Sequence, residues 1–239
     1  MTGPRADSPP DRGPVDAVVF DLYETLVTEV DVVVGPQPGR RSVAERLGID
    51  ADLFDALWRD RKSERMVRPL AFQDVLEEAC VRAGIRIDSE SRERIEELAA
   101  ERIAAKTSVL QCVDPAVLRT LEQLSAAGRP LGVISNCSVE EVAGWASSPL
   151  AGHVGTAVFS YAAGVAKPDP AIYRLACARL GVPPERCVFV GDGGSDELAG
   201  AAAVGMRAFA ARWHVDHWPA EVRRQASIRT RGFPALARP

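Results

Sequence analysis

Five short apolar runs recur along the chain and predict strands. The first is Ala17–Phe20, which ends abruptly at Asp21. Short continuous apolar runs separated by helical patterns are typical of strands that are buried on both faces of a parallel sheet. The other four runs are Pro130–Ile134, Thr156–Phe159, Cys187–Val190 and Arg207–Ala210.

The segments between these runs carry helix signals. Two of them, at 114–128 and 169–181, begin with Asp-Pro and end with Gly. Aspartate caps helix N-termini, proline suits the first helical position, and glycine commonly follows the last turn. A third helix is expected from Ser195 to Gly205. Alternating strands and helices predict an α/β fold, with a parallel sheet covered by helices on both faces.

One long segment interrupts this alternation. The stretch 30–108 has no strand signal and instead shows amphipathic helical patterns such as Leu53–Trp58 and Val75–Ala79. A connection of this length is unusual for a loop, so we interpret it as an inserted helical cap. The predicted organisation is a disordered tail at 1–14, an α/β core at 15–29 and 109–212, the cap at 30–108, and a C-terminal surface segment at 213–239.

Composition and charge narrow the possible partners. The 239 residues are 46% hydrophobic and 26% charged, with a net charge of -4 and a pI near 5.5. This acidic balance argues against general nucleic-acid binding. No apolar run reaches the ~18 residues that span a bilayer, and the N-terminus lacks the apolar segment of a signal peptide. Five cysteines without a CxxC pair predict reduced thiols. We therefore expect a cytoplasmic monomer or homodimer that binds no membrane.

Polar side chains follow each of the first four predicted strands. Ligands of parallel α/β sheets bind outside the carboxyl ends of the strands, so these positions are the first candidates for a site. Turns and helix caps explain each residue singly, but they do not explain why all of them fall at one end of one sheet. The candidates, in chain order, are Asp21, Tyr23, Thr25, Ser135, Asn136, Lys167, Asp192 and Asp196.

The acidic candidates suggest a covalent nucleophile and a metal site. Asp21 can attack a substrate as a carboxylate and so divide one difficult displacement into two steps. Asp21, Asp192 and Asp196 would lie close together, and like charges at short range raise one another's pKa unless a cation offsets them. A hard divalent ion with oxygen ligands, typically Mg²⁺, meets that need.

The remaining candidates suit an anionic substrate. Lys167 supplies a fixed positive charge, while Ser135 and Thr25 supply hydroxyl donors and the backbone around Asn136 supplies N–H groups. Phosphoryl transfer depends mainly on such positioning and charge stabilisation. The residues therefore predict a phosphate-type site for a small phosphorylated molecule.

At these residues the chain resembles the haloacid dehalogenase superfamily, over about residues 15 to 211. Four short motifs of that superfamily follow four strands in this order. Asp21 and Thr25 fit the first motif, Ser135 the second, Lys167 the third, and Asp192 with Asp196 the fourth. The resemblance implies a Rossmann-like core whose helical cap closes over small substrates, and the stretch 164–209 is similar to the family's phosphatases.

The resemblance also implies a role for each residue. Asp21 would be the nucleophile, and Mg²⁺ would be held by Asp21, Asp192 and the backbone carbonyl of Tyr23. Asp196 would hold the water shell of the metal or orient Lys167. Ser135 would bind a phosphoryl oxygen.

Two residues depart from the phosphatase pattern. Phosphatases of the family usually have a second Asp two residues after the nucleophile as general acid and base, and this chain has Tyr23 there. General acid catalysis contributes about 10²–10⁴ in rate. Tyr at this position is similar to the 2-haloacid dehalogenases, which attack carbon and need no metal, and Arg59 resembles their cap arginine. Glu24 stands where the family more often has a small residue, and it could replace the missing acid or point to solvent.

Charge decides between these two interpretations. Dehalogenase substrates carry a carboxylate, which Asp192 would repel if no metal neutralised it. Two like charges 4 Å apart cost about 4 kcal/mol at an effective dielectric constant near 20. The leading hypothesis is therefore a Mg²⁺-dependent phosphatase that acts on a small phosphorylated metabolite. The alternatives are a 2-haloacid dehalogenase-like hydrolase and a catalytically weak member that binds a phosphorylated ligand. His214 and His217 could share a helix face, but we expect packing rather than metal binding there.

Overall fold

A computed structural model describes residues 13–29, 39–214, 218 and 220–236. Its central element is a parallel sheet of six strands in the order β3-β2-β1-β4-β5-β6. This is the Rossmann-like α/β arrangement that the apolar runs predict, with one further strand. The strands are β1 Ala17–Phe20, β2 Leu131–Ser135, β3 Thr156–Phe159, β4 Cys187–Gly191, β5 Arg207–Ala211 and β6 Ala235–Leu236.

Both Asp-Pro helix starts are present as the sequence predicts. The side chain of Asp114 accepts a hydrogen bond from the backbone of Ala116, and Asp169 does the same for Ala171. The third predicted start differs, because Ser195 lies in a tight turn and the helix begins at Glu197. The core helices are α5 Pro115–Ala126, α6 Ser160–Ala163, α7 Pro170–Leu180, α8 Glu197–Ala203 and α9 Ala220–Arg229. The 3₁₀ helices are η1 Glu140–Val142, η2 Trp145–Ser147, η3 Pro149–Gly152, η4 Pro184–Arg186 and η5 Gly194–Asp196.

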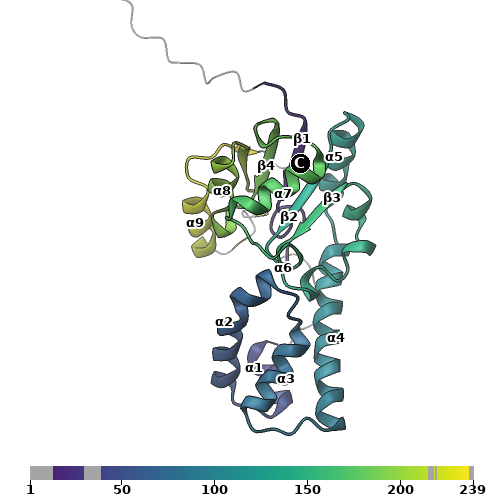
Figure 1. The fold of residues 1–239 in the computed structure, drawn as a ribbon, viewed down its shortest axis with the longest axis vertical. Coiled ribbons are helices and arrows are strands. Elements are labelled where there is room, and N and C mark those ends of the chain that lie inside the picture. The colour runs from purple at the N-terminus through teal and green to yellow at the C-terminus, as the bar shows by residue number, and fades with distance from the viewer. Residues whose placement is uncertain (1–12, 30–38, 215–217, 219, 237–239) are drawn as a thin grey trace, which may run out of the picture.

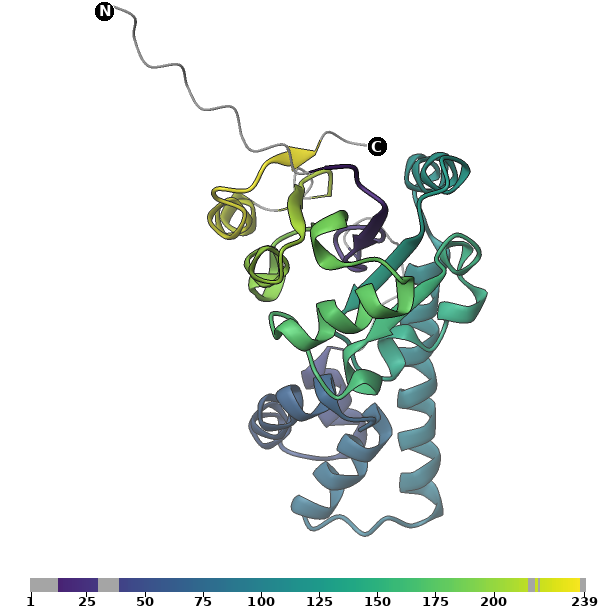
Figure 2. The same cartoon turned by 45° about the horizontal axis from the view of Figure 1, so that its top comes forward.

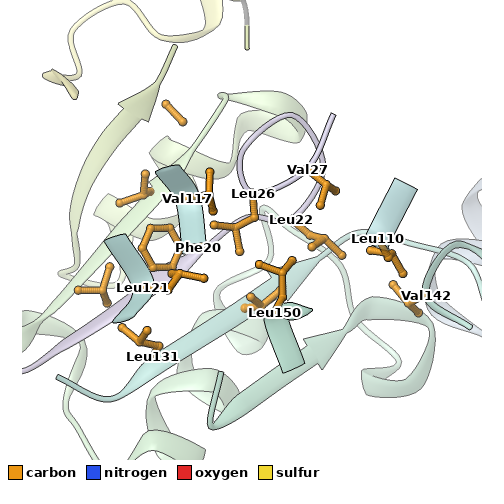
Figure 3. Close-up of a cluster of buried hydrophobic side chains, with 14 of the residues drawn as sticks. Phe20, Leu22, Leu26, Val27, Leu110, Val117, Leu121, Leu131, Val142 and Leu150 are labelled. Atoms are coloured by element: carbon orange, nitrogen blue, oxygen red, sulfur yellow. The ribbon is translucent and has the colours of Figure 1, made fainter. Parts of the chain in front are cut away.

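Each face of the sheet has its own apolar core. On one face, side chains of β1 and of the loop after it pack against α5, as Figure 3 shows for Phe20, Leu26, Val117 and Leu121. On the other face, α7 and α8 pack on alternate residues of the same strands, such as Val19. Because β1 is buried on both faces, the position of Asp21 directly after it is fixed by the packing on both sides.

The insert forms a separate helical cap below the sheet in Figure 1. Its helices are α1 Arg40–Leu47, α2 Ala51–Val67, α3 Phe72–Arg82 and α4 Ser89–Gln111. They share an apolar core of their own, which includes Phe54, Leu76 and Leu98. The long helix α4 runs from the cap into the core, so it crosses the position near 108 at which the sequence suggests the boundary (Figure 2).

A buried ion-pair network connects the cap to the core. Arg65 of α2 pairs with Glu140 of η1, and both side chains are 3% exposed. Arg102 of α4 donates to the same carboxylate at 3.0 Å, and Lys106 lies 3.7 Å from Glu141. Burial raises the pKa of Glu140, but the two arginines outweigh burial and hold the pKa below its ordinary value. The cap is therefore attached to the segment that directly follows β2.

Two tryptophans of the C-terminal segment contact the turn after β1, while most of the described residues of α9 and β6 are exposed. The indole N–H of Trp213 donates to the backbone carbonyl of Thr25 at 2.8 Å, and Trp218 donates to Glu24 at 3.2 Å. After α9 the chain returns to the sheet as β6. His214 is buried, whereas His217 lies outside the described residues. None of the helices in the described part of the chain is long and apolar enough to cross a membrane.

Candidate active site at the carboxyl ends of the strands

Asp21 and Lys167 meet at the carboxyl ends of the central strands. The Lys167 ammonium group donates to Oδ1 of Asp21 and to the carboxylate of Glu197. The hydroxyl of Thr25 donates to the other Asp21 oxygen at 3.3 Å. All four of these residues are buried. The two oxygens of Asp21 are therefore held in fixed directions, as a nucleophile requires.

The motif after β2 positions the loop that carries Lys167. The side-chain oxygen of Asn136 accepts from the Lys167 backbone N–H at 2.7 Å, and its side-chain N–H donates to the Lys167 carbonyl at 2.8 Å. Ser135 is the last residue of β2 and is 2% exposed. The parallel pairing of Phe20 with Val133 brings the ends of β1 and β2 to the same edge of the sheet. Asn136 thus acts by holding the Lys167 backbone.

Three carboxylates share this site with one lysine. Oxygens of Asp21, Asp192 and Glu197 all lie within 4.8 Å of one another. Burial by itself would lower the pKa of Lys167, but Asp21 and Glu197 more than offset burial and raise it. Lys167 is therefore charged at neutral pH. One ammonium group facing three carboxylates leaves a site that favours a further cation or a proton.

Burial and the charge of Asp21 raise the pKa of both Asp192 and Glu197. Burial, followed by the charge of Asp21, raises the pKa of Asp192 from 3.8 to about 6. One of its oxygens accepts from the backbone N–H of Gly194 at 3.0 Å, which fixes the carboxylate in place. At pH 7, which is above this raised pKa, Asp192 is ionised although burial and the charge of Asp21 favour its protonated form. Its charge therefore lowers the stability of the metal-free fold.

We expect Asp192→Asn to raise the stability of the metal-free protein. A carboxyl pKa raised to about 6 lowers the free energy of unfolding at pH 7.5 by on the order of 2–3 kcal/mol. Removing this charge should therefore raise Tm by roughly 5 °C. A raised carboxyl pKa costs stability only as pH rises through the range from 3.8 to about 6, so the gain should be smaller at pH 5. Thermal melts in chelator at both pH values test this. A variant that melts lower than wild type at pH 7.5 contradicts the prediction.

The structure places Glu197, rather than Asp196, beside Lys167. Asp196 is exposed and, like Ser195, has a positive φ, while Glu197 is 1% exposed. The backbone N–H of Gly193, at φ 90°, donates to Glu197 at 2.9 Å. A Cβ on Gly191 would lie 2.1 Å from the Glu197 carboxylate, so the acid fits only against a glycine. The available sequence signal was therefore Gly191, which makes room for the residue after Asp196.

Tyr23 and Arg59, the two residues that resemble those of dehalogenases, have different surroundings: Tyr23 is part of the core, and Arg59 is on the surface of the cap. The Tyr23 hydroxyl donates to the backbone carbonyl of Glu141 at 2.6 Å, and burial with the nearby acids raises its pKa. Arg59 is exposed and donates to the carbonyl of Asp55 at 3.1 Å, so the structure does not bring it to the site. The buried arginine of α2 is instead Arg65, six residues along the helix and so on a different face.

Glu24 is engaged in the turn after β1. Its backbone has φ 60°, and its carboxylate accepts from the Thr28 hydroxyl at 2.7 Å and the Glu29 backbone at 3.1 Å. The Trp218 indole is a third donor at 3.2 Å. Burial raises the pKa of Glu24. These contacts give Glu24 a place in the turn and leave no geometric support for a role beside Asp21.

Comparison with known proteins identifies the family. The haloacid dehalogenase-like hydrolase family matches residues 15–204, and the chain belongs to this family of enzymes. An (S)-2-haloacid dehalogenase of Pseudomonas putida is 30% identical over 196 residues, which cover 77% of this chain and 79% of that protein. The structure of a 2-haloacid dehalogenase from Pseudomonas syringae pv. Tomato DC3000 matches with a TM-score of 0.65 and 28% identity, over 83% of this chain and 86% of that one. A phosphatase of the superfamily from Thermococcus onnurineus matches with a TM-score of 0.53 and 25% identity, over 82% and 86%.

Proposed function

We propose that this hydrolase releases halide from small 2-halocarboxylic acids, with Asp21 as the nucleophile. The observation that carries the proposal is the environment of Asp21. Its carboxylate is held by Lys167 and Thr25, and the residue two positions later is a tyrosine whose hydroxyl binds the Glu141 carbonyl. A halide leaves as a stable anion and needs no proton from a general acid. The (S)-2-haloacid dehalogenase relatives support the same chemistry.

The proposed reaction has two steps. A carboxylate oxygen of Asp21 attacks C2 of the substrate and displaces halide with its bonding electrons, which leaves an ester between Asp21 and the substrate. Water then attacks the ester carbonyl carbon of Asp21, and the bond from that carbon to the substrate oxygen breaks. The 2-hydroxy acid leaves after its oxygen takes one proton of the water, and the Asp21 carboxylate is regenerated with one oxygen from water. Lys167 stabilises the charge on the attacked carboxyl group. Asp192, with a pKa of about 6, is suited to take the proton of that water near neutral pH.

Halide release tests this proposal. The (S) and (R) forms of 2-chloropropionate would be incubated with the protein in chelator, and chloride would be measured. We expect chloride release by wild type, none by Asp21→Asn, and wild-type rates for the control Asp60→Asn, which changes an exposed acid of α2. Absence of chloride release from both enantiomers, with and without Mg²⁺, would refute the proposal.

A second candidate rests on a different observation. Asp21, Asp192 and Glu197 offer hard oxygen donors within 4.8 Å of one another, a set that fits Mg²⁺. We propose as the alternative a Mg²⁺-dependent phosphatase in which Asp21 and Asp192, with the Tyr23 backbone carbonyl, would hold the ion. When bound, Mg²⁺ would neutralise the carboxylates and polarise the phosphoryl group. It would also remove the repulsion between Asp192 and an anionic substrate.

An aryl phosphate separates the two candidates. Nitrophenolate leaves without a general acid, so Tyr23 cannot mask phosphatase activity in this assay. Release of phosphate that requires both Mg²⁺ and Asp21, without any halide release, would establish the second candidate. Halide release that persists in chelator would establish the first. The Asp60→Asn control should leave either activity unchanged.

A further inference from the structure

Two buried cysteines lie side by side away from the active site. Cys177 belongs to α7, and Cys187 is the first residue of β4. Their sulfur atoms are 3.7 Å apart, and both cysteines are free thiols. A disulfide needs its sulfurs about 2 Å apart, so a small displacement of two side chains would be sufficient.

The other three cysteines have different surroundings. Cys80 lies in the cap helix α3, and Cys112 is exposed after α4. Cys137 follows β2 and lies 3.6 Å from the backbone carbonyl of Ser135. Among the described residues, Cys177 and Cys187 are the cysteines whose sulfur atoms are in contact. A reaction between thiols of one chain is therefore expected at this pair.

A surface hollow lies beside Cys177. A hollow between the end of α7 and η4 is lined by Cys177 together with Arg174, Val182 and Glu185. Cys177 is 2% exposed, and Cys187 is fully buried and is not among the residues that line the hollow. Hydrogen peroxide is close to water in size, so this hollow is the approach to the pair that the structure offers.

We propose that Cys177 and Cys187 form a reversible disulfide when the protein meets hydrogen peroxide. The thiolate of Cys177 attacks one peroxide oxygen, which gives a sulfenic acid and releases the other oxygen as water after protonation. The sulfur of Cys187 then attacks the sulfenic sulfur, and its proton leaves with the hydroxyl as a second water. Two thiols lose two electrons and two hydrogens, and one peroxide is reduced to two waters.

The surroundings of the pair support this order of events. The neighbouring thiol of Cys187 lowers the pKa of Cys177, while the pKa of Cys187 is raised by Cys177 and by burial. Cys177 is also the residue that lines the hollow. Cys177 is therefore the attacking thiol and Cys187 the resolving one.

The disulfide would stabilise the core without reaching the active site. It would join α7 to the first residue of β4, whereas Lys167 precedes α7 and Asp192 follows the last residue of β4. The bond would therefore lie at the opposite ends of both elements from the catalytic groups. We expect the oxidised form to melt several degrees higher, because a cross-link restricts the unfolded chain.

The test uses the full chain carrying Cys112→Ser, so that the exposed thiol cannot cross-link two molecules. After peroxide treatment and denaturation we expect the free thiols to fall from four to two, with a Cys177–Cys187 link in the peptide map. Reduction by dithiothreitol should restore all four. In Cys187→Ala, a dimedone label should appear on Cys177 as trapped sulfenic acid. The matched control Cys80→Ala should still form the link.

Three results would overturn the proposal. One is a link that joins other cysteines, and another is retention of four thiols in millimolar peroxide while the protein stays folded. The third is the absence of a dimedone label on Cys177 in folded Cys187→Ala after peroxide treatment. The first two are read on the Cys112→Ser protein, so they hold even where a buried substitution impairs folding.

Discussion

Replacing Asp21 by Asn is expected to lower turnover by at least about 10⁴-fold, whichever of the two reactions the enzyme performs. An amide has almost the same shape as the carboxylate but is not a nucleophile, so no covalent intermediate can form. The substitution also removes one of three crowded acids, and the pKa of Asp192 should fall from about 6 toward its ordinary value. The variant should therefore fold at least as well as wild type.

Activity and stability must be measured on the same preparations to read this result. Initial rates of halide and phosphate release give the loss of turnover, and thermal melts show that the fold is intact. Asp60→Asn, in an exposed position of α2, is the matched control. Retention of more than a few per cent of the wild-type rate in a folded Asp21→Asn protein would mean that another residue is the nucleophile.

Replacing Lys167 by Met is expected to have the largest effect on stability. The substitution leaves Asp21 and Glu197 buried without their common cation, next to Asp192. Removing one partner of a buried ion pair typically costs about 3–5 kcal/mol. Turnover should also be lost, because Lys167 no longer stabilises the attacked carboxyl group.

The stability loss in Lys167→Met should depend on pH. Unpaired buried carboxylates have raised pKa values, and such groups cost stability as pH rises through those values. Urea unfolding should therefore show a greater loss at pH 8 than at pH 5. Lys62→Met, at an exposed position of α2, should change stability little at either pH. A loss that is equal at both pH values would show that packing, not charge, is the cause.

Local patterns in the sequence were sufficient for most of the core. Apolar runs located five of the six strands, and two Asp-Pro pairs located α5 and α7 with their capping side chains. β6 was not predicted, because a strand of two residues, Ala235–Leu236, has no readable periodicity. It pairs with β5 only because α9 returns the chain to that edge of the sheet.

Part of the candidate site could likewise be located from the sequence, and part of it could not. The sequence clearly marks the strands that precede Asp21, Lys167 and Asp192. Parallel strands bring the positions after them to one edge of the sheet. The choice between Asp196 and Glu197 depended on a turn in which Ser195 and Asp196 have positive φ. Spacing alone does not reveal that turn, since residues other than glycine rarely adopt it.

The sequence by itself determined where five of the strands lie along the chain and that Asp21 and Lys167 come to the same edge of the sheet, because both depend on short-range patterns and on the geometry of parallel sheets. Only the tertiary structure decided that Arg65 rather than Arg59 faces the core, and that Glu24 is held by Trp218 from the far end of the chain. Both outcomes depend on contacts between residues distant in sequence. The direction of a helix face, or the partner of a buried carboxylate, is set by what packs against it.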